Sequence, residues 1–189
     1  MNEFYKFLAP VSILIVVLAT AVMLIRWRGD NSMSMSMHAA LDRRAYLMFA
    51  VALSLGGLLF YIFEIKWLVS HLNLSAAFVT FASLGLVLQL IAAWVPDVPG
   101  LKRRIHRPSA YTMAAIMGIL LVFLAVAPAI STMALMVSMI ALAIMAMVFG
   151  IFMIGSVSQL FSSAKSNYLI FQGSYVAVFF VAVLTVAYF

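Results

Sequence analysis

The residue best placed to do chemistry is Glu64, because it is the one acid that lies well inside a long apolar segment. An ionisable side chain is costly in a lipid environment, so such a residue is a functional candidate. Lys66 follows two residues later, and His71 follows seven residues later, on nearly the same face of an α-helix. This group could bind a lipid headgroup or pass a proton. The alternative is an interfacial group in which Lys66 extends to the membrane surface.

A second pair of candidates flanks a basic stretch. The segment WVPDVPG (residues 94–100) contains Asp97, and the segment IHRPSAY (residues 105–111) contains His106. We expect Asp97 and His106 to pair across the connection between two apolar segments and to fix their approach. The alternative is a solvated loop followed by a helix-initiating sequence.

Methionine and serine alternate in the segment MSMSMH, residues 33–38. In an extended chain, the thioethers of Met33, Met35 and Met37 project on one side, with the His38 imidazole next in line. Such soft ligands suit Cu(I), so these four residues are the candidate metal site and copper is the candidate cofactor. The alternative is that methionine is a flexible filler of apolar packing, as it is elsewhere in the chain.

No catalytic constellation is evident in the sequence. Cysteine is absent, so the chain has no disulfides, thiolate metal sites or thiol nucleophiles. There is no HExxH motif, phosphate-binding loop or nucleophile elbow. An enzyme therefore has little support, and no catalytic residue is predicted.

Six apolar segments must position these side chains. A helix that crosses the hydrocarbon layer needs about 20 apolar residues. The predicted spans are residues 8–26, 45–68, 75–95, 109–129, 133–155 and 167–188. The first is expected to be a retained span rather than a signal peptide, because its apolar run continues to Ile25. No segment alternates like a barrel strand, so we predict an all-α, six-helix transmembrane bundle that forms one domain over residues 1–189.

The composition agrees with a membrane protein. Hydrophobic residues make up 67% of the chain and charged residues 8%, with a mean hydropathy of +1.21. Soluble domains have about 45–50% apolar and about 25% charged residues. The composition therefore disfavours a soluble globular protein, a disordered chain and a nucleic-acid binder, despite the net charge of +6.

The basic residues indicate an orientation. Three connections between spans contain Arg26, Arg28, Arg43 and Arg44, then Lys102, Arg103, Arg104 and Arg107, and finally Lys165. The other side has only Lys6 and Lys66. Because cytoplasmic loops are enriched in lysine and arginine, both termini are predicted to lie outside and the basic connections in the cytoplasm.

The segment of residues 94–111 also carries a family resemblance. The third predicted span ends in proline and an acid, and a histidine opens the fourth. This pattern resembles prokaryotic six-helix membrane proteins of unknown function related to the FRAG/DRAM/Sfk group. The resemblance implies a prokaryotic plasma membrane, a role in lipid and membrane homeostasis, and Pro96, Asp97 and His106 as matching positions. It also implies a cytoplasmic N-terminus, the reverse of the orientation that the charges predict.

These observations favour a non-enzymatic integral membrane protein that acts through lipid or a membrane partner. One alternative is a copper-handling membrane protein that uses the MSMSMH segment. Another is a structural subunit of a larger membrane complex. The expected partners are membrane lipid and either another membrane protein or a second copy of the chain, and nucleic acid is not expected.

Overall fold

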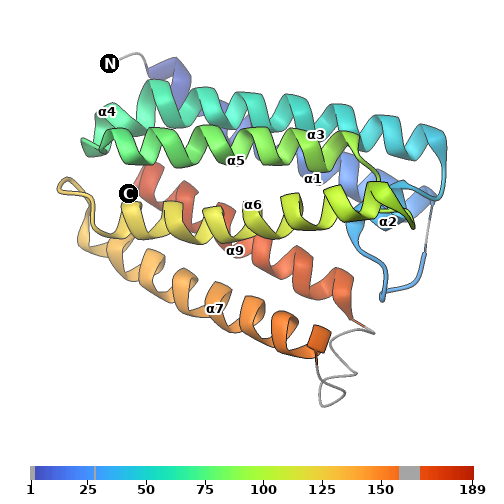
Figure 1. Ribbon diagram of the computed structural model, residues 1–189. Helices are drawn as coiled ribbons and strands as arrows, with labels where there is room; N and C mark the ends of the chain where they lie inside the picture. The colour runs from blue at the N-terminus through green and yellow to red at the C-terminus, as the bar shows by residue number, and fades with distance from the viewer. Residues whose placement is uncertain (1–2, 28, 158–166) are drawn as a thin grey trace.

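The computed structural model describes residues 3–27, 29–157 and 167–189, with the backbone alone for residues 152–157. All regular elements within these residues are helices, and six are long and apolar enough to cross a membrane (Figure 1). The predicted all-α, six-helix architecture is confirmed, and it indicates an integral membrane protein.

The long helices are α1 (Leu8–Arg26), α3 (Arg43–Phe63), α5 (Ala76–Trp94), α6 (Leu101–Ala125), α7 (Thr132–Val157) and α9 (Tyr168–Tyr188). The shorter elements are a 3-10 helix η1 (Glu3–Phe7), the helix α2 (Met35–Ala39), a π-helix η2 (Glu64–Leu68) and α4 (Val69–Leu72). Without a break, α3, η2 and α4 form one span of 30 residues. The predicted spans agree with these helices to within a few residues, except at the fourth.

The fourth span begins at Leu101 rather than residue 109 and ends at Ala125 rather than residue 129. Pro108 therefore lies inside α6 and not at its start. The hydropathy pattern misses the first two turns because they are amphipathic. Their outer positions are basic, while His106 and Ser109 are buried.

Local sequence signals set the ends of the second span. Asp42 is the N-cap of α3, and its Oδ1 accepts hydrogen bonds from the backbone N–H groups of Arg44 (2.7 Å) and Ala45 (3.2 Å). Aspartate is among the preferred residues at this position because it satisfies free N–H groups of the first turn. At the other end, Asn73 takes the left-handed conformation (φ 53°) that commonly ends a helix.

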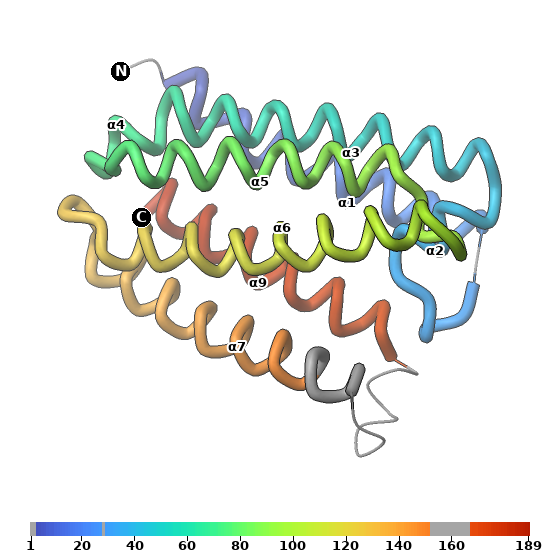
Figure 2. Tube along the Cα trace, viewed as in Figure 1, coloured from blue at the N-terminus to red at the C-terminus, as the bar shows by residue number. Residues whose placement is uncertain are grey.

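The bundle has two groups of three helices (Figures 1 and 2). In one group α1 packs on α3 and α3 packs on α5, and in the other α6 packs on α7 and α7 packs on α9. The two groups meet where α5 contacts α6. The main core is rich in aromatic side chains, including Phe60, Phe63, Trp67 and Phe179.

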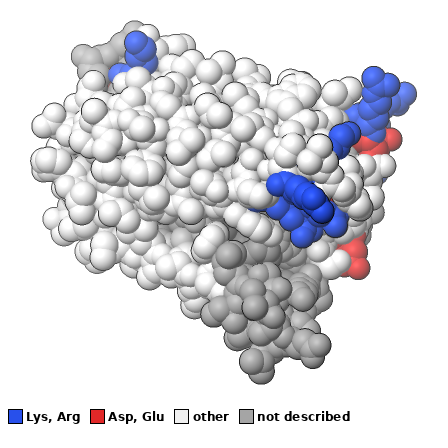
Figure 3. All heavy atoms as spheres, in the orientation of Figure 1, with Lys and Arg blue, Asp and Glu red and all other residues white. Residues whose placement is uncertain are grey.

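Lysine and arginine gather at one end of the molecule, which we call the basic end (Figure 3). The last residue of α1, the first residues of α3 and the first two turns of α6 bring together Arg26, Arg43, Arg44, Lys102, Arg103, Arg104 and Arg107. A broad band without charged side chains covers most of the face that Figure 3 shows. Arg28 and Lys165, which the charge count also used, lie outside the described residues.

Candidate functional site

A central cavity of about 170 Å³ lies between α1, α3 and α5 on one side and α6 and α9 on the other. Apolar side chains form most of its walls, among them Val16, Leu53, Phe60, Ile116, Leu120 and Phe179. Along α3 and into η2 it extends from Phe49 to Glu64, or about 22 Å at about 1.5 Å per residue. The cavity is therefore long and narrow and follows the direction of the helices.

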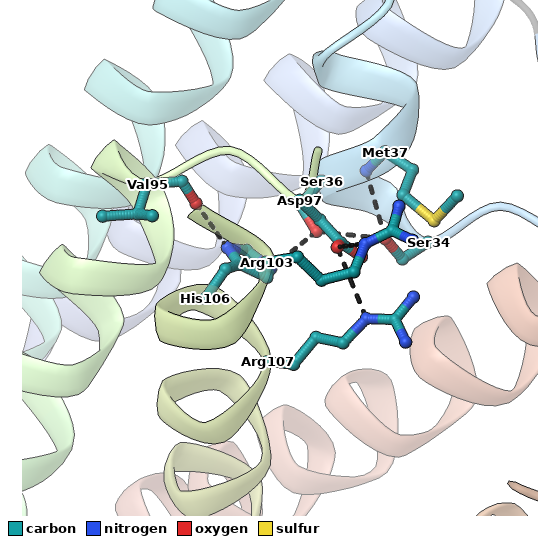
Figure 4. A network of polar contacts seen from close by, with 8 residues as sticks. All are labelled: Ser34, Ser36, Met37, Val95, Asp97, Arg103, His106 and Arg107. Atoms are coloured by element: carbon teal, nitrogen blue, oxygen red, sulfur yellow. Dashed lines mark hydrogen bonds and ion pairs between the residues drawn. The ribbon is translucent and has the colours of Figure 1, made fainter. Parts of the chain in front are cut away.

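At the basic end, α2 is tied to two long helices. His106 on α6 donates from Nδ1 to the carbonyl oxygen of Val95 (2.6 Å), and its Nε2 is 2.9 Å from Ser36 Oγ on α2 (Figure 4). Because a carbonyl oxygen only accepts, Nδ1 carries a proton, and the Ser36 hydroxyl is the hydrogen-bond partner of Nε2. The backbone N–H of Met35 donates to Gln172 Oε1 on α9 (2.9 Å). The polar groups at this end are thus paired with one another.

Asp97 and His106 have separate partners, so the expected pair between them is not formed. Asp97 Oδ1 accepts from Arg103 Nε (2.9 Å) and Arg107 Nε (3.4 Å) (Figure 4). The two arginines are one turn apart on α6 and share a face, whereas His106 is directed towards α2 and the central cavity. Asp97 therefore fixes the α5–α6 loop to the first turns of α6.

In the middle of the cavity, polar side chains are satisfied by backbone carbonyl groups. Ser12 Oγ donates to the Gly56 carbonyl (2.7 Å), and Gln89 Nε2 donates to the Leu53 carbonyl (2.8 Å). A Cβ atom at Gly57 would lie 2.5 Å from Gln89 Nε2, so the absence of a side chain there leaves room for the Gln89 amide group. These bonds hold α1 and α5 against α3.

Glu64 lies at the far end of the cavity from His106 and is the first residue of η2. Its side chain is only 5% exposed, lines the cavity, and has no hydrogen-bond or ion-pair partner among the residues that the structure describes. The expected group of Glu64, Lys66 and His71 is not assembled. Lys66 and His71 are exposed, and the His71 ring stacks on Trp67 at 4.2 Å between centroids. The π-helix has more residues per turn than an α-helix, so it rotates His71 away from the face of Glu64.

The MSMSMH segment is helical from Met35 onwards rather than extended throughout. Ser34 is the N-cap of α2, and its Oγ accepts from the backbone N–H of Met37 (3.1 Å). Met35 lines the central cavity, and Met37 is half-buried on α2. The three thioethers therefore do not form the row that an extended chain would give.

Two of the four candidate metal ligands share one position beside Gly29. A Cβ atom at Gly29 would lie 2.7 Å from Met33 Sδ and 3.0 Å from His38 Nε2. His38 is buried and donates from Nδ1 to the Ser34 carbonyl oxygen (2.9 Å), which leaves Nε2 as the ring's lone-pair donor. Within the described parts of the chain, no three histidine, aspartate or glutamate side chains gather as a metal site.

The sequence alone does not reveal the cavity or the hydrogen-bond partners of Ser36 and Gln172. Their contacts depend on which helix faces meet, and spacing along the chain does not show this. A scan of protein-family models and searches of curated proteins and of solved structures found no match to this chain.

Proposed function

We propose that the protein binds a lipid-like molecule whose hydrocarbon chain occupies the central cavity, and that it acts in the membrane without catalysing a reaction. The cavity itself carries this proposal. At about 170 Å³ it is close to an engineered apolar cavity of about 150 Å³ that holds benzene. It is smaller than the pockets of about 300–1,000 Å³ that enclose drug-sized ligands. Its length and apolar walls favour a single narrow chain.

The proposed setting is a prokaryotic plasma membrane, with the basic end in the cytoplasm and both termini outside. The gathering of arginine and lysine at one end of the bundle supports this orientation through the positive-inside rule. The resemblance to the FRAG/DRAM/Sfk group supports a role in lipid homeostasis. The resemblance implies a cytoplasmic N-terminus, which is the opposite of the orientation that the basic residues favour.

A cavity-filling variant tests the proposal. Ala110 lines the central cavity and also a smaller cavity of about 90 Å³ beside α7 and α9, so Ala110→Phe fills the place where both meet. Ala115→Phe is the matched control, because Ala115 is exposed on the same helix. The probe is a neutral long-chain alcohol with a diazirine in its chain, added to protein in phosphatidylcholine nanodiscs.

We expect photolabelling of cavity residues on α3, α6 and α9 in the wild type and in Ala115→Phe. In Ala110→Phe most of this labelling should be lost. Folding is checked by elution volume and melting temperature. A folded Ala110→Phe variant that is labelled like the wild type would refute the proposal, as would labelling confined to the outer faces of the helices.

A second candidate function, copper handling, is supported by the position that Met33 and His38 share beside Gly29. A backbone carbonyl at Nδ1 is a common outer partner of a metal-binding histidine, and thioether with imidazole suits Cu(I). This function predicts that Met33→Leu weakens Cu(I) binding in competition with a chromogenic chelator. Met35→Leu, which changes a cavity residue, should leave Cu(I) binding unchanged. Equal binding by both variants and the wild type would count against copper.

A further inference from the structure

We propose that the cavity's ligand is a cationic amphiphile, with its hydrocarbon chain along the cavity and its ammonium group at Glu64. This inference rests on the proposed function and specifies the class of ligand. It follows from the carboxyl group at one end of the cavity, the surrounding aromatic rings and the pairing of the polar groups at the other end.

The Glu64 carboxyl group lies inside the bundle without a hydrogen-bond or ion-pair partner among the described residues. Glu64 as a whole is 5% exposed and lines the cavity, and no described residue bonds to its carboxyl group. Burying a charged or polar group without a hydrogen bond is costly. Ser12 and Gln89, which line the same cavity, each bond to a backbone carbonyl. Those two side chains are donors with an acceptor each, whereas the Glu64 carboxyl group is without a donor, and a ligand N–H group would supply one.

The nearby cations of the protein are directed elsewhere. Lys66 is exposed, and Lys6 Nζ lies 5.3 Å from the Trp67 ring centroid and 4.4 Å from that of Tyr188. No described lysine or arginine forms an ion pair with Glu64. An ammonium group on the ligand would supply the positive charge that no described lysine or arginine supplies there, and a carboxylate or phosphate would be disfavoured beside the acid.

The rings around this end of the cavity favour an ammonium group over a neutral hydroxyl. Phe60 lies 6.0 Å from Phe179 and 5.7 Å from Phe180 between ring centroids, and all three line the cavity with Glu64. The faces of aromatic rings attract cations, most strongly where water is excluded. The aromatic rings and the acid therefore select the same chemical group.

The backbone at Glu64 is also unusual. The N–H of Val69 bonds to the Glu64 carbonyl, five residues back, which defines the π-helix η2. Short π-helical segments are rare in proteins, and those that occur are often found at functional sites. At the other end of the cavity, His106, Ser36 and Gln172 already have partners. The ligand's polar end therefore belongs at Glu64.

Three probes with the same chain test this assignment: dodecylamine, dodecanol and dodecanoate. Each competes with the neutral photoprobe for protein in phosphatidylcholine nanodiscs. In the wild type, dodecylamine should compete at the lowest concentration and dodecanoate at the highest. In Glu64→Gln, dodecylamine should compete about tenfold to hundredfold more weakly, the worth of a charge-assisted hydrogen bond, while dodecanol is unchanged. Glu3→Gln is the matched control, because Glu3 is exposed and outside the cavity.

The outcomes separate this inference from the function on which it rests. If dodecylamine and dodecanol compete equally in the wild type, the inference is wrong, whether or not Glu64→Gln folds. If Glu64→Gln is folded and binds dodecylamine as the wild type does, the inference is also wrong, while loss of photolabelling in Ala110→Phe still supports lipid binding. Proton flux into proteoliposomes that depends on Glu64, without any preference for the amine, would replace the inference by a water-filled path.

Discussion

Asp97 is a buried acid whose charge is balanced by two arginines of α6. Its own side chain is 5% exposed, while those of Arg103 and Arg107 are 33% and 44% exposed. Because the arginines keep part of their hydration, removing the acid leaves two cations that water can still reach. The pair therefore acts mainly by holding the α5–α6 loop in place.

We predict that Asp97→Asn lowers the free energy of unfolding by about 1–3 kcal/mol, because an amide is a weaker acceptor for the two guanidinium groups. Melting temperature in detergent measures this loss. Asp42→Asn is the control, since asparagine caps a helix as well as aspartate does. Equal melting of Asp97→Asn and the wild type would show that the ion pairs contribute nothing.

For single residues, the sequence identifies the candidate polar side chains but not the groups that they contact. Asp97, His106 and Glu64 stand out because polar and ionisable side chains near apolar segments are costly. Their contacts were mispredicted because the start of α6 and the π-helix at Glu64 decide which side chains share a face. Neither feature has a clear hydropathy signal.

Among the elements, α2 depends most on its surroundings. It has five residues and is bonded to α6 through Ser36 and to α9 through the backbone of Met35. A helix this short is not stable alone in water. The alternation of methionine and serine predicts an extended segment. Long-range contacts and the Ser34 cap instead make it helical from Met35 onwards.

Ser36→Ala should loosen α2, because it removes the hydroxyl that bonds to buried His106 Nε2. We expect a loss of about 1–2 kcal/mol in the free energy of unfolding. We also expect faster hydrogen exchange at the α2 amides than in Ser32→Ala, which lies on an exposed turn. Unchanged exchange in α2 would mean that the bond from Ser36 to His106 does not hold this helix.

The whole molecule combines an apolar band with a concentration of arginine and lysine at one end. The six-helix architecture was predictable, because backbone polar groups in lipid must be satisfied internally and long apolar runs satisfy them only as helices. The central cavity was not, since it depends on how six helices with apolar residues on all faces pack together.

Single cysteines test the orientation, because the chain has none of its own. Ser32 is exposed at the basic end, and Thr132 is exposed at the start of α7, on the opposite side. In intact cells a membrane-impermeant maleimide should label Thr132→Cys and spare Ser32→Cys until the cells are lysed. Labelling of Ser32→Cys in intact cells would invert the orientation and agree with the family resemblance.

Pro108 has a mechanical consequence for α6. Proline has no N–H, so the carbonyl of Arg104 loses its usual bond within the helix, and bending is easiest where that bond is missing. Pro108 lies between the turns that Asp97 holds and the stretch from Ala110 to Leu120 that lines the cavity. Bending of α6 is therefore easiest at Pro108, and a bend there would change the width of the central cavity while the outer turns stay bonded to Asp97.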